Sequence, residues 1–345
     1  LDSGPDVAAA ALSNTLIPDP LIRSFSEAKI TRLLISPDGE LFNAPFDALP
    51  ISGEASNELL IRHFEVSMVP SFSWLRELQA GITAPNHLNA DALIIANPSV
   101  DQQNCRPSGI QADTLPQIGE WRDLSGTVDE AKAVLEYASP ESHLLSGESA
   151  TSSNFRAEDL QQFQIIHFAT HAFLGRTSQT SSLLFGCPSN PDMITGDEVT
   201  NLHLSNQLVI LSACETAVGK GLATEGNDSL AWGFLTAGAA TSVASRWNIE
   251  DRAAAEFVNL FYENLSKGMT VDAALRIAKL TEIDDLRRPV REWASFTSIG
   301  YGDLTVALRP SSSQTSGTIT RLWPVAILIL VLAGTLILQY LGRRA

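Results

Sequence analysis

The chain has 345 residues, of which 44% are apolar and 18% are charged, a balance that is typical of folded proteins and excludes disordered and collagen-like chains. At roughly 150 residues per domain, the length fits two compact units or one large unit with appendages. The net charge of -16 argues against a nucleic-acid partner. The 3 cysteines, Cys105, Cys187 and Cys214, are too few and too irregularly spaced for a disulfide framework, and no CxxC pair offers a zinc site.

The first predicted elements form the edge of a sheet. Residues 1–28 are interpreted as a lead-in, the end of a longer N-terminal region. The apolar segments 29–35 and 59–69 are predicted strands of a hairpin or edge region, and 91–98 is a predicted buried strand. Thr127 and Glu130 have the spacing of a capping box, which predicts a helix from there to Tyr137.

The following segments alternate strands with helices. Strands are predicted over 164–174, 206–211, 240–247 and 293–300. Helices are predicted over 229–239, over 251–265 with Asp251 as the cap, and over 270–280 with Thr270 as the cap. This alternation predicts an α/β fold with a mostly parallel central sheet flanked by helices. We therefore expect one such domain over 29–308.

The C-terminal segment has the composition of a membrane anchor. Residues 309–321 are rich in Ser and Thr, as expected of a linker, and 322–341 form a run of 20 residues without a formal charge. As a helix this run would span about 30 Å, the thickness of a bilayer core. A basic tail follows over 342–345. We expect a single-pass membrane protein. Its flanking charges do not fix the orientation, although a reactive thiolate slightly favours a cytoplasmic catalytic domain.

One cysteine and one histidine fall where chemistry is expected in such a fold. His171 ends one predicted core strand, and Cys214 follows the uninterrupted apolar run 208–211, at a distance of 43 residues along the chain. If the two strands are neighbours, both side chains emerge at the same edge of the sheet. An imidazole within reach lowers the pKa of a thiol and makes it a nucleophile. The pattern therefore indicates a Cys/His dyad.

Both motifs resemble those of a known family. The segments HFATHA (167–172) and LSACETAVGKG (211–221) resemble the CHAT domains, caspase-like peptidases of clan CD that are related to separases and often fused to tetratricopeptide repeats. The likeness covers about 29–302. It implies a caspase-like sandwich in which Cys214 is the nucleophile, His171 is the base, and His167 is structural. It also implies protein or peptide substrates, with tetratricopeptide-type repeats or a regulatory partner N-terminal to the domain.

The same resemblance suggests how an oxyanion would be stabilised. Caspase-like enzymes use backbone N–H groups of the cysteine and of the residue after the histidine, which are Cys214 and Ala172 here. No third member of a triad is evident from spacing. The acidic residues Glu215, Asp197 and Asp228 are candidates for a substrate pocket that prefers a basic or polar side chain before the scissile bond.

Two other interpretations of these segments fit the sequence less well. His167 and His171 have a spacing that could bind zinc on a helix, but the Glu of HExxH is missing and the segment is a predicted strand. Residues 219–221 lack the first Gly and the Ser/Thr of a phosphate loop. No metal or organic cofactor is implied. Two alternatives to a peptidase stay open: a catalytically silent interaction module and a non-peptidase thiol hydrolase.

Overall fold

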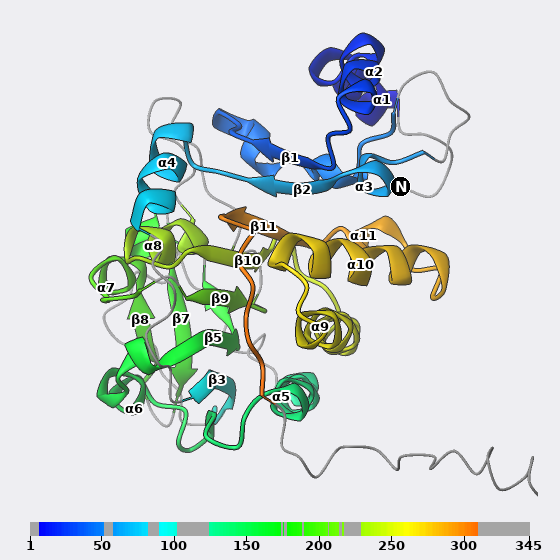
Figure 1. Cartoon of the computed structure of the whole chain (residues 1–345). Coiled ribbons are helices and arrows are strands. Elements are labelled where there is room, and N and C mark those ends of the chain that lie inside the picture. The colour runs from blue at the N-terminus through cyan, green and yellow to red at the C-terminus, as the bar shows by residue number, and fades with distance from the viewer. Residues whose placement is uncertain are drawn as a thin grey trace, which may run out of the picture. The chain divides into compact units, whose positions relative to one another are not determined.

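The central feature of the fold is an eight-stranded, mostly parallel sheet. The computed structural model describes residues 7–51, 58–81, 90–101, 124–173, 175, 178–187, 190–205, 207–213, 216 and 229–309. In spatial order the strands are β1 (Arg32–Ile35), β2 (Glu65–Met68), β11 (Phe296–Gly300), β10 (Thr241–Ser245), β9 (Leu208–Leu211), β5 (Phe163–Ala169), β3 (Ala90–Pro98) and β4 (His143–Gly147) (Figure 1). All neighbours are parallel except β10 and β11. The predicted α/β class and mostly parallel sheet are confirmed.

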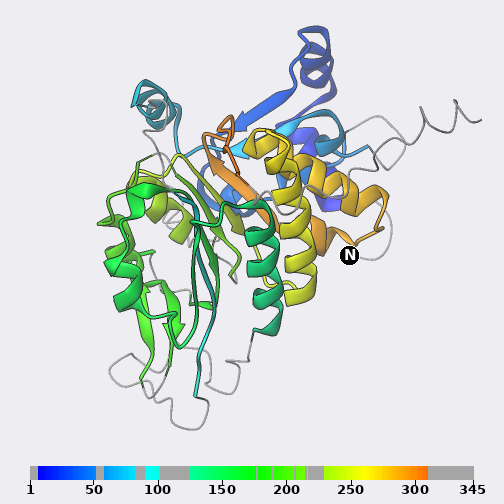
Figure 2. The ribbon, with the colours of Figure 1, turned by 60° about the horizontal axis from the view of Figure 1, so that its bottom comes forward.

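Helices cover both faces of the sheet. One face is covered by α5 (Ser125–Tyr137), α9 (Asp251–Ser266) and α10 (Val271–Asp284), as Figures 1 and 2 show. The other face is covered by α6 (Ser152–Ala157), α7 (Gly196–Thr200), α8 (Leu230–Thr236) and a small antiparallel sheet of β6 (Ala172–Phe173), β7 (Ser182–Gly186) and β8 (Asp192–Thr195). Alternate residues of each central strand therefore enter two separate cores.

Strand β5 shows this alternation directly. Ile165 and Ala169 pack in the core under α5 and α9, whereas Ile166 and Phe168 pack in the core on the opposite face. His167 lies on the same face of the sheet as Ile165 and Ala169, and it is fully buried. A polar side chain that is placed there must find its partners within the protein.

Of the hairpin or edge region predicted near the N-terminus, the edge is confirmed and the hairpin is wrong. Strands β1 and β2 are parallel neighbours at the sheet edge, joined by a crossover that contains the short 3₁₀ helices η1 (Gly39–Asn43) and η2 (Phe46–Ala48). The predicted strand 59–69 begins instead as α3 (Leu60–His63) and becomes β2 only at Glu65. A short apolar run such as Leu59 to Ile61 does not distinguish a buried helix from a buried strand.

The remaining helices precede or follow strands of the sheets along the chain. Helices α1 (Val7–Leu16) and α2 (Asp19–Glu27) precede β1, and α4 (Phe72–Gly81) follows β2. Helix α11 (Val290–Trp293) occupies the start of the strand predicted over 293–300, so β11 begins later, at Phe296. Two 3₁₀ turns, η4 (Leu160–Gln162) and η5 (Ser178–Thr180), precede β5 and β7.

Two of the predicted helix caps are wrong. Helix α5 begins at Ser125 with no side-chain cap, and Glu130 is not part of a capping box because its carboxylate bonds to His167 instead. Helix α9 begins at Asp251, but Glu250 is the N-cap residue and no side chain caps the helix. The cap of α10 is as predicted, because the Thr270 side chain accepts a hydrogen bond from the Ala273 N–H.

A buried carboxylate fixes the end of the domain. Asp91, at the start of β3, has no exposed surface and accepts hydrogen bonds from the backbone N–H of Ser139 at 2.7 Å and of Arg309 at 2.7 Å. The Arg309 guanidinium also pairs with it at 2.7 Å. Arg309, expected to open the linker, is thus held against the sheet, and the compact unit ends there.

The expected membrane segment lies outside this part of the structure. Residues 322–341 are not among the described residues. Within the described ranges, no helix combines the length and the apolarity that a membrane crossing requires.

A buried carboxyl group in α10 predicts a pH dependence of stability. Glu282 is 1% exposed, and its Oε2 atom has no hydrogen-bond partner among the described residues. Burial raises the pKa of Glu282 from 4.5 to about 7, with Arg288 opposing the shift. The carboxyl group is therefore harder to ionise in the folded state. The ionisation of Glu282 should therefore lower the free energy of unfolding as pH rises from about 4.5 to 7. Above that range the contribution of Glu282 to this free energy should be constant.

Replacing this group tests the pH dependence. We expect Glu282→Gln to raise the free energy of unfolding at pH 8 by on the order of 1–2 kcal/mol and to change it little at pH 4.5. Urea denaturation at both pH values measures this, with the exposed Glu136→Gln on α5 as the control. Equal effects of Glu282→Gln at the two pH values would contradict the prediction.

Candidate active site

The candidate site lies at the carboxyl ends of β5, β9 and β10, which we call the carboxyl edge. Strands β5 and β9 are parallel neighbours in which Phe168 is paired with Leu211, and the Ser212 N–H donates to the Phe168 carbonyl at 2.8 Å. His171 follows Phe168 by three residues, and in the sequence Cys214 follows Leu211 by the same number. Cys214 itself lies outside the described residues. The strand adjacency that a Cys/His dyad requires is therefore present.

The backbone around His171 is held by the small sheet. The Leu184 N–H donates to the His171 carbonyl at 2.9 Å, and the buried Thr170 hydroxyl donates to the Leu184 carbonyl at 2.6 Å. Ala172 is paired with Leu183 in the same antiparallel ladder. Hydrogen-bonded and non-hydrogen-bonded pairs alternate in such a ladder, so the bond at His171 turns the Ala172 N–H away from β7. This N–H is therefore available for another acceptor.

The residues that flank Cys214 in sequence are anchored to β9 and β10. The buried Thr216 hydroxyl has the carbonyls of Leu211 at 3.1 Å and Ala213 at 3.3 Å as acceptors. The Ser245 hydroxyl, at the end of β10, also donates to the Ala213 carbonyl. Sequence reasoning did not single out Thr216 or Ser245. Small hydroxyl residues directly after buried strands are the signal that could have indicated them.

His167 lies in the core beneath this edge. Its Nε2 atom is 2.8 Å from the carboxylate of Glu130 on α5, and its Nδ1 atom is 3.1 Å from the hydroxyl of Tyr262 on α9. All three side chains are at most 1% exposed. Burial, together with Glu130, raises the pKa of Tyr262 well above its usual value, so this hydroxyl keeps its proton. Both nitrogens of His167 are thus engaged in joining the strand to two helices.

Asp251, the first residue of α9, lies within electrostatic reach of His171. Burial raises the pKa of Asp251, Glu130 and Glu250 raise it further, and the imidazole of His171 lowers it. Asp251 is half-buried and, within the described residues, forms no side-chain hydrogen bond. The sequence predicts only a helix cap at this position.

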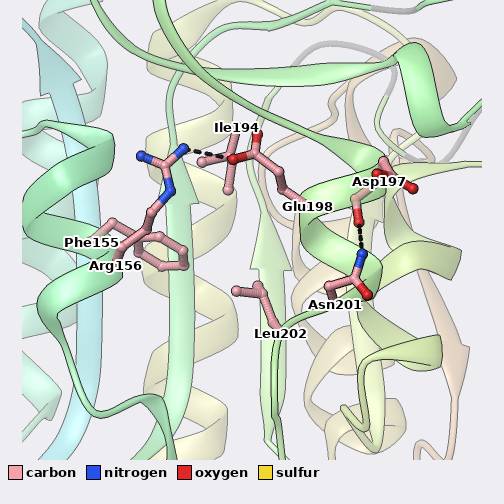
Figure 3. Close-up of a pocket in the computed structure, with 7 residues that line it drawn as sticks. All are labelled: Phe155, Arg156, Ile194, Asp197, Glu198, Asn201 and Leu202. Atoms are coloured by element: carbon pink, nitrogen blue, oxygen red, sulfur yellow. Dashed lines mark hydrogen bonds and ion pairs between the residues drawn. The ribbon is translucent and has the colours of Figure 1, made fainter.

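The predicted acidic pocket residues are described only in part. Glu215 and Asp228 lie outside the described residues. Asp197, near the start of α7, lines a pocket of about 270 Å³ between α6 and α7 (Figure 3). In the same pocket the Arg156 guanidinium donates a hydrogen bond to Glu198 at 2.8 Å. The apolar part of the lining is formed by Phe155, Ile194 and Leu202. His171 is not among the residues that line this pocket.

Cys187 differs from the sequence expectation. The sequence predicts no disulfide framework, but Cys187 is fully buried and disulfide-bonded. The backbone of Cys187 also forms a bridge with Val100, since its N–H donates to Ser99 and its carbonyl accepts from Asp101, both at 2.9 Å. The other two cysteines of the chain lie outside the described residues. No cluster of potential metal ligands occurs among the side chains that the structure describes.

Comparison with known proteins agrees with this geometry. The model of the CHAT domain matches residues 6–301, which is most of the chain. The chain belongs to the CHAT family. A human relative, tetratricopeptide repeat protein 28, is 26% identical over 315 residues, which cover 78% of this chain but only 12% of that protein. The CHAT domain therefore matches a small part of a much longer relative.

Solved structures of cysteine peptidases share the fold of this CHAT domain. Gingipain R, described as an Arg specific cysteine proteinase, superposes with a TM-score of 0.53 at 13% identity and covers 86% of this chain and 70% of its own. The separase–securin complex of Saccharomyces cerevisiae gives a TM-score of 0.50 at 14% identity, with 81% of this chain and 17% of that chain covered. At such low identity these likenesses show the caspase-like fold alone.

The buried histidine network predicts a stability effect. Tyr262→Phe removes the hydroxyl that bonds to Nδ1 of His167 and leaves a buried nitrogen without a partner, which should lower the free energy of unfolding by about 1–3 kcal/mol. Urea denaturation measures this. Tyr137→Phe on α5, which removes a half-buried hydroxyl without a hydrogen bond to any described residue, is the control. A Tyr262→Phe variant as stable as this control would refute the network.

Proposed function

We propose that this CHAT domain is a cysteine endopeptidase that uses a Cys214/His171 dyad to cleave protein substrates. The observation that supports this best is the register of β5 and β9, in which Phe168 is paired with Leu211 on the adjacent parallel strand. In the sequence, His171 follows Phe168 by three residues and Cys214 follows Leu211 by three. Parallel strands deliver their following residues to the same edge of a sheet. The family and the fold of gingipain R agree with this chemistry.

The proposed mechanism uses only groups of this chain. The Cys214 thiol transfers its proton to His171, and the thiolate attacks the scissile carbonyl. The oxyanion that forms is stabilised by the backbone N–H groups of Cys214 and Ala172, the latter directed away from β7. The imidazolium then donates its proton to the leaving amine, and water releases the acyl group from the sulfur.

The nucleophile and the base can be tested separately. We expect Cys214→Ala and His171→Ala each to lower cleavage of a protein substrate on the order of a thousandfold or more, with unchanged thermal unfolding, because both positions lie beyond strand ends. The exposed His203→Ala is the matched control for the histidine. Activity of either variant close to that of the parent would exclude the dyad.

Covalent probes separate this proposal from its two alternatives. An acyloxymethyl ketone should label Cys214, whereas a fluorophosphonate should not. Absence of labelling would favour a silent interaction module, and labelling without cleavage of any protein would favour a non-peptidase thiol hydrolase. A peptide library then reports the substrate class. The acidic candidates Asp197, Glu215 and Asp228 favour a basic residue before the scissile bond, and a strict preference for Asp would contradict this.

Two further parts of the proposal concern the context of the domain. The relative named for its tetratricopeptide repeats supports such repeats N-terminal to this domain as a regulatory partner. The apolar run 322–341 supports a membrane anchor. The disulfide at Cys187 opposes the cytoplasmic expectation, because disulfides persist mainly in oxidising compartments.

Removal of the proposed anchor gives a direct test. We expect the full chain to sediment with membranes and a chain without 322–345 to remain in the soluble fraction with its fold intact, because the compact unit already ends at Arg309. Replacing both Arg343 and Arg344 with Gln is the control, since it keeps the apolar run. A full chain that is soluble after lysis would refute the anchor.

The side of the membrane needs a second measurement. A cysteine introduced at Ser313 is exposed to an impermeant maleimide in intact cells, with the parent chain as the background. Labelling assigns the domain to the outer side, in agreement with the disulfide. Labelling only after permeabilisation assigns it to the cytoplasm.

A further inference from the structure

Strands β5, β9 and β10 all end at the carboxyl edge, and the segment after β10 leads to a carboxylate that has no role in the dyad. Strand β10 runs parallel to β9, so its end lies at the same edge as those of β5 and β9. Six residues after β10 the chain reaches Asp251, the first residue of α9. Helix α9 therefore starts at the edge where His171 lies.

The way in which α9 packs on β5 also brings Asp251 toward His171, and this argument does not use their electrostatic interaction. Tyr262 of α9 contacts His167 of β5. Asp251 precedes Tyr262 by eleven residues, or about 16 Å of helix. His171 follows His167 by four residues, so it lies just beyond the end of β5 and at most about 13 Å along the chain from His167. Since α9 starts at the carboxyl edge, both Asp251 and His171 are displaced toward that edge from the contact between Tyr262 and His167.

The start of α9 is held in place by α5. A Cβ atom on Gly126 would lie 2.9 Å from the carbonyl carbon of Asp251, so the two backbones approach as closely as a glycine permits. One turn later on α5, Glu130 bonds to His167. The position of Asp251 is therefore fixed by the same two helices and the same strand that fix the histidine segment.

The Asp251 carboxylate is free to act on the imidazole. It does not cap its own helix, and no hydrogen bond to it occurs among the described residues. Its electrostatic interaction with His171 agrees with the packing of α9 on β5. The other carboxylates that act on Asp251 are Glu130 of α5, which is engaged by His167, and Glu250, which is exposed.

We propose that Asp251 is the positioning residue for His171 and orients its imidazole. This inference rests on the proposed peptidase function. The charge of the carboxylate favours the tautomer and the ring orientation that bring an N–H toward Asp251, and it stabilises the imidazolium after the Cys214 proton has moved. Asp251 itself neither gains nor loses a proton and does not contact the substrate.

The test compares Asp251→Asn with Glu250→Gln, a matched loss of one negative charge at the neighbouring residue. Cleavage gives kcat and KM, and the rate of Cys214 alkylation by iodoacetamide between pH 5 and 9 reports the thiolate directly. We expect Asp251→Asn to lower kcat about tenfold to a hundredfold with little change in KM. The alkaline limb of its pH profile should move to lower pH, because an anion that favours the imidazolium has been removed. Glu250→Gln should stay within about twofold of the parent.

The outcomes distinguish this inference from the function on which it rests. A parent that cleaves nothing and whose Cys214 is no more reactive than a free thiol overturns both. An active parent with an equally active Asp251→Asn variant and an unshifted pH profile overturns only the role of Asp251. A raised KM for basic peptides with unchanged kcat also overturns it, because Asp251 then contacts the substrate. Asp251→Ser, which suits the first turn of a helix, repeats the test if the Asn variant is unstable.

Discussion

The hydrogen bonds of one buried imidazole determine how the layers of this domain fit together. Strand β5 is covered on both faces, so His167 has no access to water and must be satisfied by the protein. Glu130 and Tyr262 meet this requirement from two different helices. The strand that leads to His171 is thereby tied to α5 and α9, and the position of the candidate base follows from an interaction in the core.

The parallel order of the strands explains why the candidate chemistry gathers at one edge. Parallel strands in the order β10, β9 and β5 end side by side, and each is followed by a segment that carries polar residues. The carbonyl of Ala213 is held from β10 through Ser245, and the carbonyl of His171 is held from β7. Backbone groups on both sides of the proposed dyad are thus fixed by neighbouring strands, which is the preorganisation that oxyanion stabilisation requires.

Much of this arrangement could be predicted from the sequence because its signals are local. The apolar run 208–211, the HFATHA segment and the Thr270 cap each depend on residues close together in the chain, and they were found where expected. The errors arose where a distant residue competes for a side chain. Glu130 has the spacing of a cap, yet it bonds to a histidine 37 residues away. Neither the place of Asp251 beside His171 nor the disulfide at Cys187 has any local signal.

The contacts of Arg309 with Asp91 separate the end of the compact unit from the carboxyl edge. Asp91 and Gln164, which hold the end of the domain, lie at the starts of β3 and β5, and so at the edge opposite to His171. The compact unit therefore ends at the edge away from His171, and the two side chains that hold its last residues can be replaced without changing the carboxyl edge.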